Sequence, residues 1–206
     1  MKTKNQKIVK NDFQSGFTLL ELLVVIVILG ILVTIGLGTF LSSQVKSRDA
    51  KRKNDLEQIA KALEMYHSDH GHYPVNNDSG QIRAWFDDDG EDVAADYEWG
   101  DKFDDPAQPL TIYMSVLPQD SSSGKRYYYQ AYHADFSDAD GFDAHSTAGS
   151  DHQAEAYKLY AQLENANDSS IVSGGIADTD CGTDPVETSL CNYYLTSQNI
   201  TLDQGD

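Results

Sequence analysis

The longest apolar stretch of the chain runs from residue 17 to residue 41. Its only strongly polar members are Glu21 and the threonines at positions 18, 34 and 39. As an α-helix of 25 residues it would measure about 37 Å, more than the roughly 30 Å of a bilayer's hydrocarbon core. The pattern predicts a membrane-spanning helix in which Glu21 needs a partner, because an unpaired carboxylate there is costly.

Residues 42–74 continue this helix with a different pattern. Apolar side chains recur at helical spacing on one face, and polar side chains occupy the rest of the wheel. Because Gly71 and Pro74 end the pattern, one helix over residues 17–70 is predicted, with an outer half that a folded domain must cover. The apolar stripe of this amphipathic half consists of Leu56, Ile59, Ala60, Leu63 and Tyr66.

Alternating side chains predict three β-strands in the second half of the chain. An antiparallel sheet of three or four strands, laid over the helical stripe, gives an α+β head that spans residues 75–206. The predicted strands are residues 125–134, 155–164 and 192–197.

The segment 75–110 differs sharply in composition, with eleven acidic residues and only Arg83 and Lys102 as cations. It also contains aromatic residues, which supply enough apolar area to pin it to the head. We therefore predict an inserted, surface-exposed acidic loop here, followed by a short helix over residues 110–117.

Acidic residues dominate the chain, with 33 Asp and Glu against 15 Lys and Arg and a formal charge of −18. Such an excess argues against binding to nucleic acid, which needs clustered cations. Two short segments break the pattern. The first sixteen residues carry four lysines against one aspartate, and five cations lie between Lys46 and Lys53.

The only two cysteines, Cys181 and Cys191, lie ten positions apart near the C-terminus. In an oxidising compartment such a pair forms a disulfide, which would close the loop 181–191. Two free thiols or half of a zinc site are the alternatives, but the scattered histidines in this half of the chain give zinc little support. The disulfide places the head outside the cytoplasm and the lysine-containing N-terminus inside it.

The N-terminus resembles the prepilin signature of the type IV pilin and type II secretion pseudopilin superfamily. The features that carry the resemblance are a short lysine-containing leader over residues 1–16, Gly16, Phe17 and then "TLLELLVVIVILGIL" with Glu21. An ordinary secretory signal would instead have a shorter apolar run with a small-x-small cut site after it. The resemblance implies cleavage between Gly16 and Phe17 by the prepilin peptidase, methylation of the new N-terminus, and pairing of Glu21 with a neighbour's N-terminal amine.

The resemblance extends to "GHYP", residues 71–74, and loosely to the strand segments. It implies a pilin-like fold and assembly of the chain with itself into a helical homopolymer, driven by an assembly platform and an ATPase. The precursor would span the inner membrane once, and the product would be an extracellular or periplasmic filament. The Lys46–Lys53 cluster would then lie beneath acidic heads of the filament and reduce their repulsion, so that assembly weakens at high salt.

Two functions remain open on the sequence alone: the subunit of a type IV pilus, and the major pseudopilin of a type II secretion system. The large acidic insert favours the pilus, whereas "GHYP" favours secretion. No catalytic motif is present, so a membrane-anchored enzyme is the least favoured alternative. The histidines at positions 67, 70 and 72 are predicted to be solvated surface residues.

The segment "DFSDADGFD", residues 135–143, comes nearest to a ligand site. It offers four carboxylates around a glycine, and hard cations such as calcium bind several oxygen ligands. A solvated acidic loop is the alternative, since Phe136 occupies the first ligand position of an EF-hand pattern. The candidate calcium ligands are Asp135, Asp138, Asp140 and Asp143.

Overall fold

The computed structural model describes residues 16–88, 91–133, 143–144, 154–176, 179–182 and 189–197. The chain divides into two compact units, Met1–Gln44 and Val45–Asp206, which are described separately. One helix, α1, runs from Leu19 to His70 and contributes to both units. This confirms the long N-terminal helix that the two hydrophobic patterns predicted.

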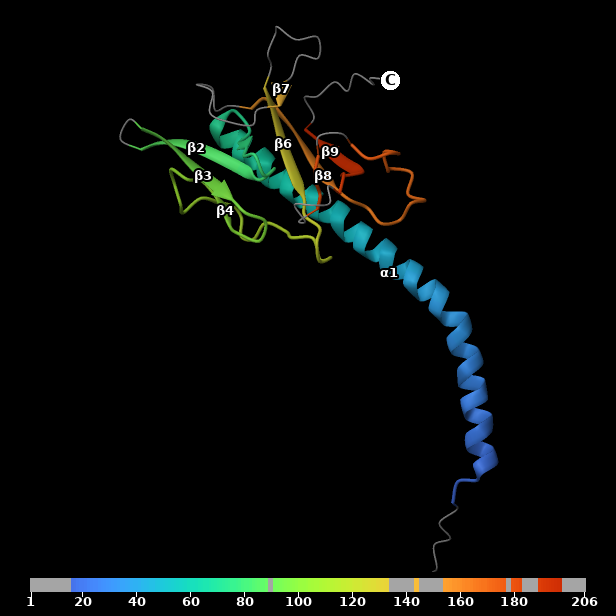
Figure 1. Ribbon diagram of the computed structural model, residues 1–206. Helices are drawn as coiled ribbons and strands as arrows, with labels where there is room; N and C mark the ends of the chain where they lie inside the picture. The colour runs from blue at the N-terminus through green and yellow to red at the C-terminus, as the bar shows by residue number, and fades with distance from the viewer. Residues whose placement is uncertain are drawn as a thin grey trace, which may run out of the picture. The chain divides into compact units, whose positions relative to one another are not determined.

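The second unit is called the head below, and its described residues form three antiparallel sheets (Figure 1). Their strand orders are β1-β2-β3, β4-β5 and β7-β6-β8-β9. The strands are β1 (Val75–Asn76), β2 (Ile82–Asp88), β3 (Glu91–Tyr97), β4 (Phe103–Asp104), β5 (Ile112–Met114), β6 (Tyr128–His133), β7 (Asp143–Ala144), β8 (Ala156–Ala161) and β9 (Tyr193–Thr196).

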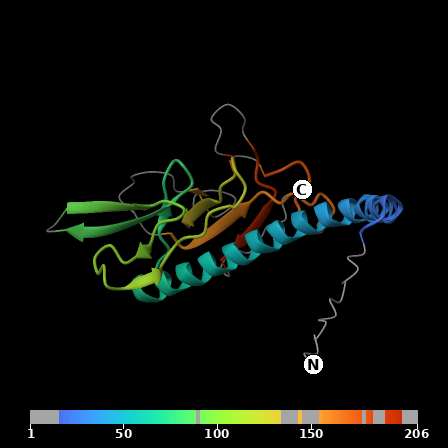
Figure 2. The same cartoon turned by 90° about the horizontal axis from the view of Figure 1, so that it is seen from below.

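The four-stranded sheet confirms the three strands predicted from alternation. β6 pairs with β8 from Tyr128↔Tyr160 to Tyr132↔Ala156, and β8 pairs with β9 from Lys158↔Thr196 to Ala161↔Tyr193. Its inner face packs on α1, so the head has a helix layer and a sheet layer, as the turned view in Figure 2 shows. The α+β class and the antiparallel sheet over the helical stripe are therefore confirmed.

The core forms between the predicted stripe of α1 and aromatic side chains of the sheets. Leu56, Ile59, Leu63 and Tyr66 are completely buried, whereas Ala60 lies at the edge of the core. The side chains that meet this stripe from the strands and their connections include Phe103, Leu117, Tyr127, Tyr129, Tyr157 and Leu159. Burying apolar surface stabilises a fold by about 25 cal/mol per Å², so this contact is the main source of the stability of the head.

The outer face of the four-stranded sheet carries a second, smaller apolar cluster. A disulfide joins Cys181 to Cys191, and both cysteines are buried against Tyr160 of β8. Ile176 and Tyr194 pack at the border of this cluster. The expected disulfide is thus present, and it explains why Tyr160 is buried although it points away from the main core.

Residues 75–117 differ from their prediction as an exposed loop over 75–110 followed by a helix over 110–117. They contain β1 to β4, and residues 112–114 form strand β5 instead of part of a helix. Ile82, Ala84 and Phe103 are fully buried, so this segment contributes to the core. The acidic composition masked the alternation in β2, where buried Ile82 and Ala84 flank half-buried Arg83.

Candidate functional site

The start of α1 holds the residues that carry the prepilin resemblance. Gly16 and Phe17 are exposed and precede the helix, which begins at Leu19. The Thr18 hydroxyl oxygen accepts a hydrogen bond from the backbone N–H of Glu21 at 3.2 Å. Thr-x-x-Glu at a helix start is the capping-box pattern, in which the side chain of the first residue satisfies a free N–H of the first turn. Glu21 therefore stands in the first helical turn, where a carboxylate interacts favourably with the helix dipole.

The apolar side chains that the structure describes between Phe17 and Val33 are exposed. Those from Leu22 to Val33 have about half of their surface accessible, and Leu19 is 86% exposed. Exposed apolar area of this extent is typical of a surface that another molecule or a lipid covers. Within the described part of the chain, no helix combines the length and the apolar character needed to cross a membrane. The membrane-spanning segment at residues 17–41 stays a prediction.

A buried cluster of charges lies on α1 near the beginning of the head. The Arg52 side chain is only 2% exposed, and its guanidinium group contacts three carboxylates. The distances are 2.8 Å to Asp49, 2.6 Å to Asp120 and 2.7 Å to Glu164. The Ser122 hydroxyl accepts a further hydrogen bond from Nη2 at 2.8 Å. Burial alone would lower the pKa of Arg52, but the hydrogen bonds to these carboxylates raise it overall.

Asp49 connects this cluster to the backbone after β8. Its two oxygens accept hydrogen bonds from the N–H groups of Glu164 (2.9 Å) and Asn165 (2.8 Å). Asp120 belongs to the connection between β5 and β6, so Arg52 and Asp49 together tie two distant loops to one helical turn. Asp49 thus accepts hydrogen bonds from Arg52 and from two backbone N–H groups, and these bonds offset the cost of removing its carboxylate from water.

Two further ion pairs flank the cluster at its solvent-exposed border. Arg48 binds Glu164 with Nε at 3.1 Å, and Lys53 Nζ lies 2.8 Å from Asp168. The hydrogen bonds from Arg48 and the one from Arg52 lower the pKa of Glu164 to about 2. The hydrogen bonds from Lys53 and from the Ser170 backbone likewise lower the pKa of Asp168 to about 2.

This arrangement corrects the expectation for the Lys46–Lys53 cluster. Arg48, Arg52 and Lys53 are paired with carboxylates of their own head, so they do not depend on the heads of neighbouring subunits for partners. Lys46 and Lys51 are exposed. Sequence reasoning missed this site because the carboxylates of Asp120 and Glu164 come from positions 68 and 112 residues away from Arg52. One indication was available: positions 52 and 49 extend the apolar stripe backwards from Leu56 at helical spacing.

The histidines at the end of α1 are less exposed than predicted. His70 Nε2 lies 3.2 Å from the Tyr113 hydroxyl and 3.4 Å from Asp105, and its ring stacks on Tyr66. His67 and His72 are half-buried as well. The prediction of a solvated surface was therefore wrong, since the segment 103–113 covers this end of the helix.

The calcium site proposed from the sequence falls largely outside the described residues. Asp135, Asp138 and Asp140 lie there, and only the backbone of Asp143 is described, as part of β7. Among the residues that the structure describes, no group of three or more His, Cys, Asp or Glu side chains is placed to hold a metal ion. Calcium binding stays a prediction.

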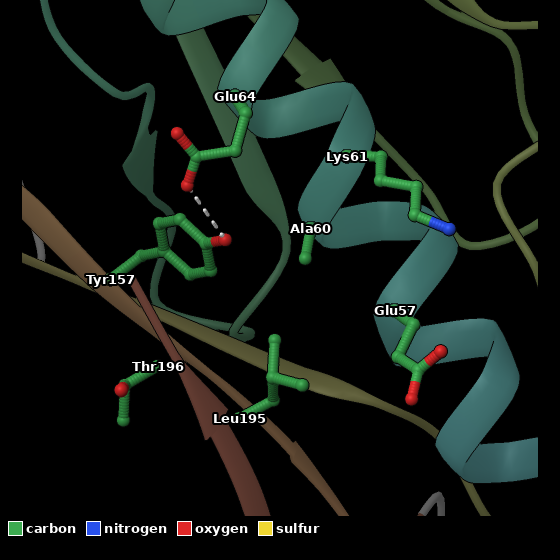
Figure 3. A pocket seen from close by; sticks show the side chains of 7 residues that line it. All are labelled: Glu57, Ala60, Lys61, Glu64, Tyr157, Leu195 and Thr196. Carbon is green, nitrogen blue, oxygen red and sulfur yellow. Dashed lines mark hydrogen bonds between the residues drawn. The ribbon is translucent and has the colours of Figure 1, made fainter. Parts of the chain in front are cut away.

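A groove of about 300 Å³ lies between α1 and the sheet (Figure 3). Ala60 of α1 and Leu195 of β9 face one another across it, and the ring of Tyr157 closes one end. The Tyr157 hydroxyl donates to Glu64 at 3.4 Å. Glu57 and Lys61 stand on the helical rim, so the groove has an apolar floor and a charged border.

Residues 12–37 match the family described as "Prokaryotic N-terminal methylation motif". This chain carries a prepilin-type N-terminus. The matched range contains Gly16, Phe17 and Glu21, the three positions on which the resemblance was based.

Curated relatives to which this chain is similar are named "Type II secretion system core protein G". The protein from Escherichia coli (strain K12) is 41% identical over 66 residues, which cover 32% of this chain and 46% of that protein. The one from Aeromonas hydrophila is 44% identical over 62 residues, or 30% and 43% of the two chains. The one from Vibrio cholerae serotype O1 is 41% identical over 64 residues, or 31% and 44%. The matched region thus spans less than half the length of these relatives.

No solved structure matches this chain significantly. The two sequence similarities are consistent with the type IV pilin superfamily.

Proposed function

We propose that the chain is the major pseudopilin of a type II protein secretion system. The observation that carries the proposal is the combination of the methylation motif at residues 12–37 with relatives named as core protein G of that system. These similarities favour the secretion alternative over the pilus that the acidic insert had favoured. The role is structural: the chain polymerises with itself and has no catalytic part in secretion.

Maturation of the precursor follows from the same motif. The prepilin peptidase cuts between Gly16 and Phe17, the Phe17 amine is methylated, and an assembly platform with its ATPase adds the subunit to a periplasmic filament. Before assembly the precursor is held in the inner membrane by residues 17–41. Exposure of Gly16 and Phe17 ahead of the helix supports access of a peptidase to this bond.

Deletion of the gene distinguishes secretion from a pilus. We expect exoproteins to accumulate inside the deletion strain while long surface fibres, seen by electron microscopy of sheared cells, stay unchanged. Complementation with the wild-type gene should restore export. Loss of long surface fibres with normal export would instead assign the chain to a type IV pilus.

Mass spectrometry of the assembled protein tests the maturation step. The expected N-terminus is Phe17 with one added methyl group, and Gly16→Leu should block cleavage. A filament subunit that begins at Met1 would contradict the proposal.

A further inference from the structure

One surface segment of the head is both uncharged and apolar. Residues 106–118 contain no Asp, Glu, Lys or Arg, although 48 of the 206 residues of the chain are of these types. Three apolar side chains of this segment are exposed to solvent: Leu110 by 98%, Ile112 by 51% and Val116 by 60%. Exposed apolar side chains that gather in one segment mark an interaction surface more often than isolated ones do.

Hydrogen bonds around Asp105 stabilise the turn that carries Leu110. Asp105 is buried, and one of its carboxylate oxygens accepts hydrogen bonds from the N–H groups of Ala107 (2.9 Å) and Gln108 (3.1 Å). The Asp105 N–H donates to the Thr111 carbonyl at 2.9 Å, which closes the turn that presents Leu110. A preorganised apolar side chain loses little conformational entropy when it binds.

The groove of Figure 3 offers a matching surface on the same molecule. Ala60 and Leu195 face one another across it, the ring of Tyr157 closes one end, and Glu57 and Lys61 border it. In Figure 1, β4 lies on one flank of the head part of α1, whereas β9, which lines the groove, lies on the other. A protrusion and a groove on opposite flanks of one chain make a head-to-tail contact, which repeats from copy to copy and produces an open helical polymer.

We propose that Leu110 of one copy inserts into the groove between α1 and β9 of a second copy. Charge favours this occupant: a chain with a net charge of −18 repels its copies, and an uncharged segment is where two copies approach at least cost. The groove is lined by Glu57 and Glu64 against the single cation Lys61, so its net negative charge disfavours an acidic protrusion more than a neutral one. The inference rests on the proposed function as a filament subunit, and adds to it a contact between heads.

Disulfide trapping in assembled filaments tests the contact. With Leu110→Cys and Ala60→Cys in one chain, oxidation should give a ladder of covalent multimers that reductant collapses. Each single substitution should give only monomers, because a head-to-tail contact pairs unlike positions. Ser121→Cys with Ala60→Cys is the matched control, since Ser121 is exposed but lies outside segment 106–118, and should also give monomers.

Three results would overturn the inference. Normal filaments without a ladder would remove this contact and leave the proposed function intact. Dimers from Leu110→Cys alone would show that like positions meet. Absence of filaments from the wild-type chain, under conditions where a related pseudopilin assembles, would contradict both the contact and the proposed function.

A charge exchange gives an independent readout without crosslinks. Leu110→Asp should lower filament yield on the order of tenfold or more, because it brings a carboxylate against Glu57. Adding Glu57→Lys should restore the yield, whereas Gln58→Lys on the neighbouring exposed position should restore less. Ser121→Asp adds the same charge elsewhere and should assemble normally. Normal yield from Leu110→Asp, or equal rescue by both lysine variants, would contradict the contact.

Discussion

Single charged residues explain how α1 is fixed against the rest of the head. A buried ion pair adds little net stability compared with a well-packed apolar contact, because desolvation offsets most of the attraction. Removing one partner, however, leaves the others buried without compensation. Arg52 is the shared partner of Asp49, Asp120 and Glu164, so it is the position where a substitution affects the most groups.

Replacing Arg52 by methionine should therefore destabilise the head strongly. We expect a loss of about 3–5 kcal/mol in the free energy of unfolding, since Asp49 and Asp120 stay buried and unpaired. Urea denaturation of the full chain in detergent measures it. Arg48→Met is the matched control and should cost much less, because the Arg48 side chain is 35% exposed. Equal midpoints for wild type and Arg52→Met would show that the cluster is dispensable.

Acid titration tests the role of Glu164. Its pKa is lowered from the usual 4.5 to about 2, first by the hydrogen bonds from Arg48 and then by the one from Arg52. A lowered pKa means that the ionised carboxylate stabilises the folded state above pH 4.5, and that this contribution disappears as the pH falls towards 2. The stability difference between wild type and Glu164→Gln should therefore be constant from pH 6 to 8 and shrink between pH 4.5 and 2. A difference that does not depend on pH would assign Glu164 a packing role only.

The substitution of Glu21 separates two roles of its side chain. In the chain by itself the backbone N–H of Glu21 donates to the Thr18 hydroxyl, and in a capping box a glutamate or glutamine side chain at this position can also accept a hydrogen bond from the N–H of the first residue. In a filament the proposed partner is a neighbour's Phe17 amine, which requires the charge. We expect Glu21→Gln and Glu21→Ala to be cleaved after Gly16 but to assemble poorly, as measured by the yield of sheared filaments.

The Glu21→Gln variant distinguishes a requirement for the charge from a requirement for helix capping. Normal assembly of Glu21→Gln together with poor assembly of Glu21→Ala would mean that helix capping, and not charge, is what the filament needs. Thr18→Ser keeps the capping hydroxyl and should behave as wild type.

At the scale of elements, local periodicity predicted the parts whose pattern was not disturbed by charge. The 3.6-residue stripe from Leu56 to Tyr66 predicted the buried face of α1, and alternation predicted β6, β8 and β9. The strands in segment 75–117 were missed because its high content of acidic residues, such as Asp96 in β3 and Asp104 in β4, suggested an exposed loop. The buried charges of α1 could not be predicted, because their partners come from loops whose position only the folded chain determines.

In the turn between β1 and β2, both the backbone conformation and the packing against Tyr128 require a glycine at position 80. Gly80 has a φ of +69°, and a Cβ at this position would lie 2.2 Å from the Tyr128 ring. Gly80→Ala should therefore cost more than the roughly 1–2 kcal/mol of the left-handed conformation alone. Gly71 has a φ of +79° with nothing within 4 Å of the added Cβ, so Gly71→Ala isolates the backbone contribution. Equal losses of stability in the two variants would show that Tyr128 moves aside freely.

At the scale of the whole molecule, net charge governs how copies approach one another. The sequence predicted that cations at the base of the head attract acidic neighbours, but three of these cations are already paired within their own head. Repulsion between the acidic heads is then the dominant long-range interaction.

Because repulsion dominates, we expect assembly to strengthen at high salt, which is the opposite of the dependence predicted from the sequence. Raising the salt concentration from about 0.01 M to 1 M shortens the Debye length from about 30 Å to about 3 Å and screens the repulsion. Filament yield, measured by sedimentation, should therefore rise with salt. The wild type should respond more than a variant with several exposed aspartates of the head changed to asparagine. A yield that falls with salt would restore the attraction predicted from the sequence.

The Arg52 cluster also determines how the head responds to mechanical force. Its members on α1, Asp49 and Arg52, lie within the first ten residues of the second unit. Tension that travels along α1 from Gln44 therefore reaches them before the apolar stripe. Hydrogen bonds weaken steeply once their angles are lost, whereas apolar side chains that slide past one another keep forming new contacts. Under tension along α1, the ion pairs of Arg52 should therefore hold until their hydrogen bonds break. The apolar contacts of the stripe should then give way gradually.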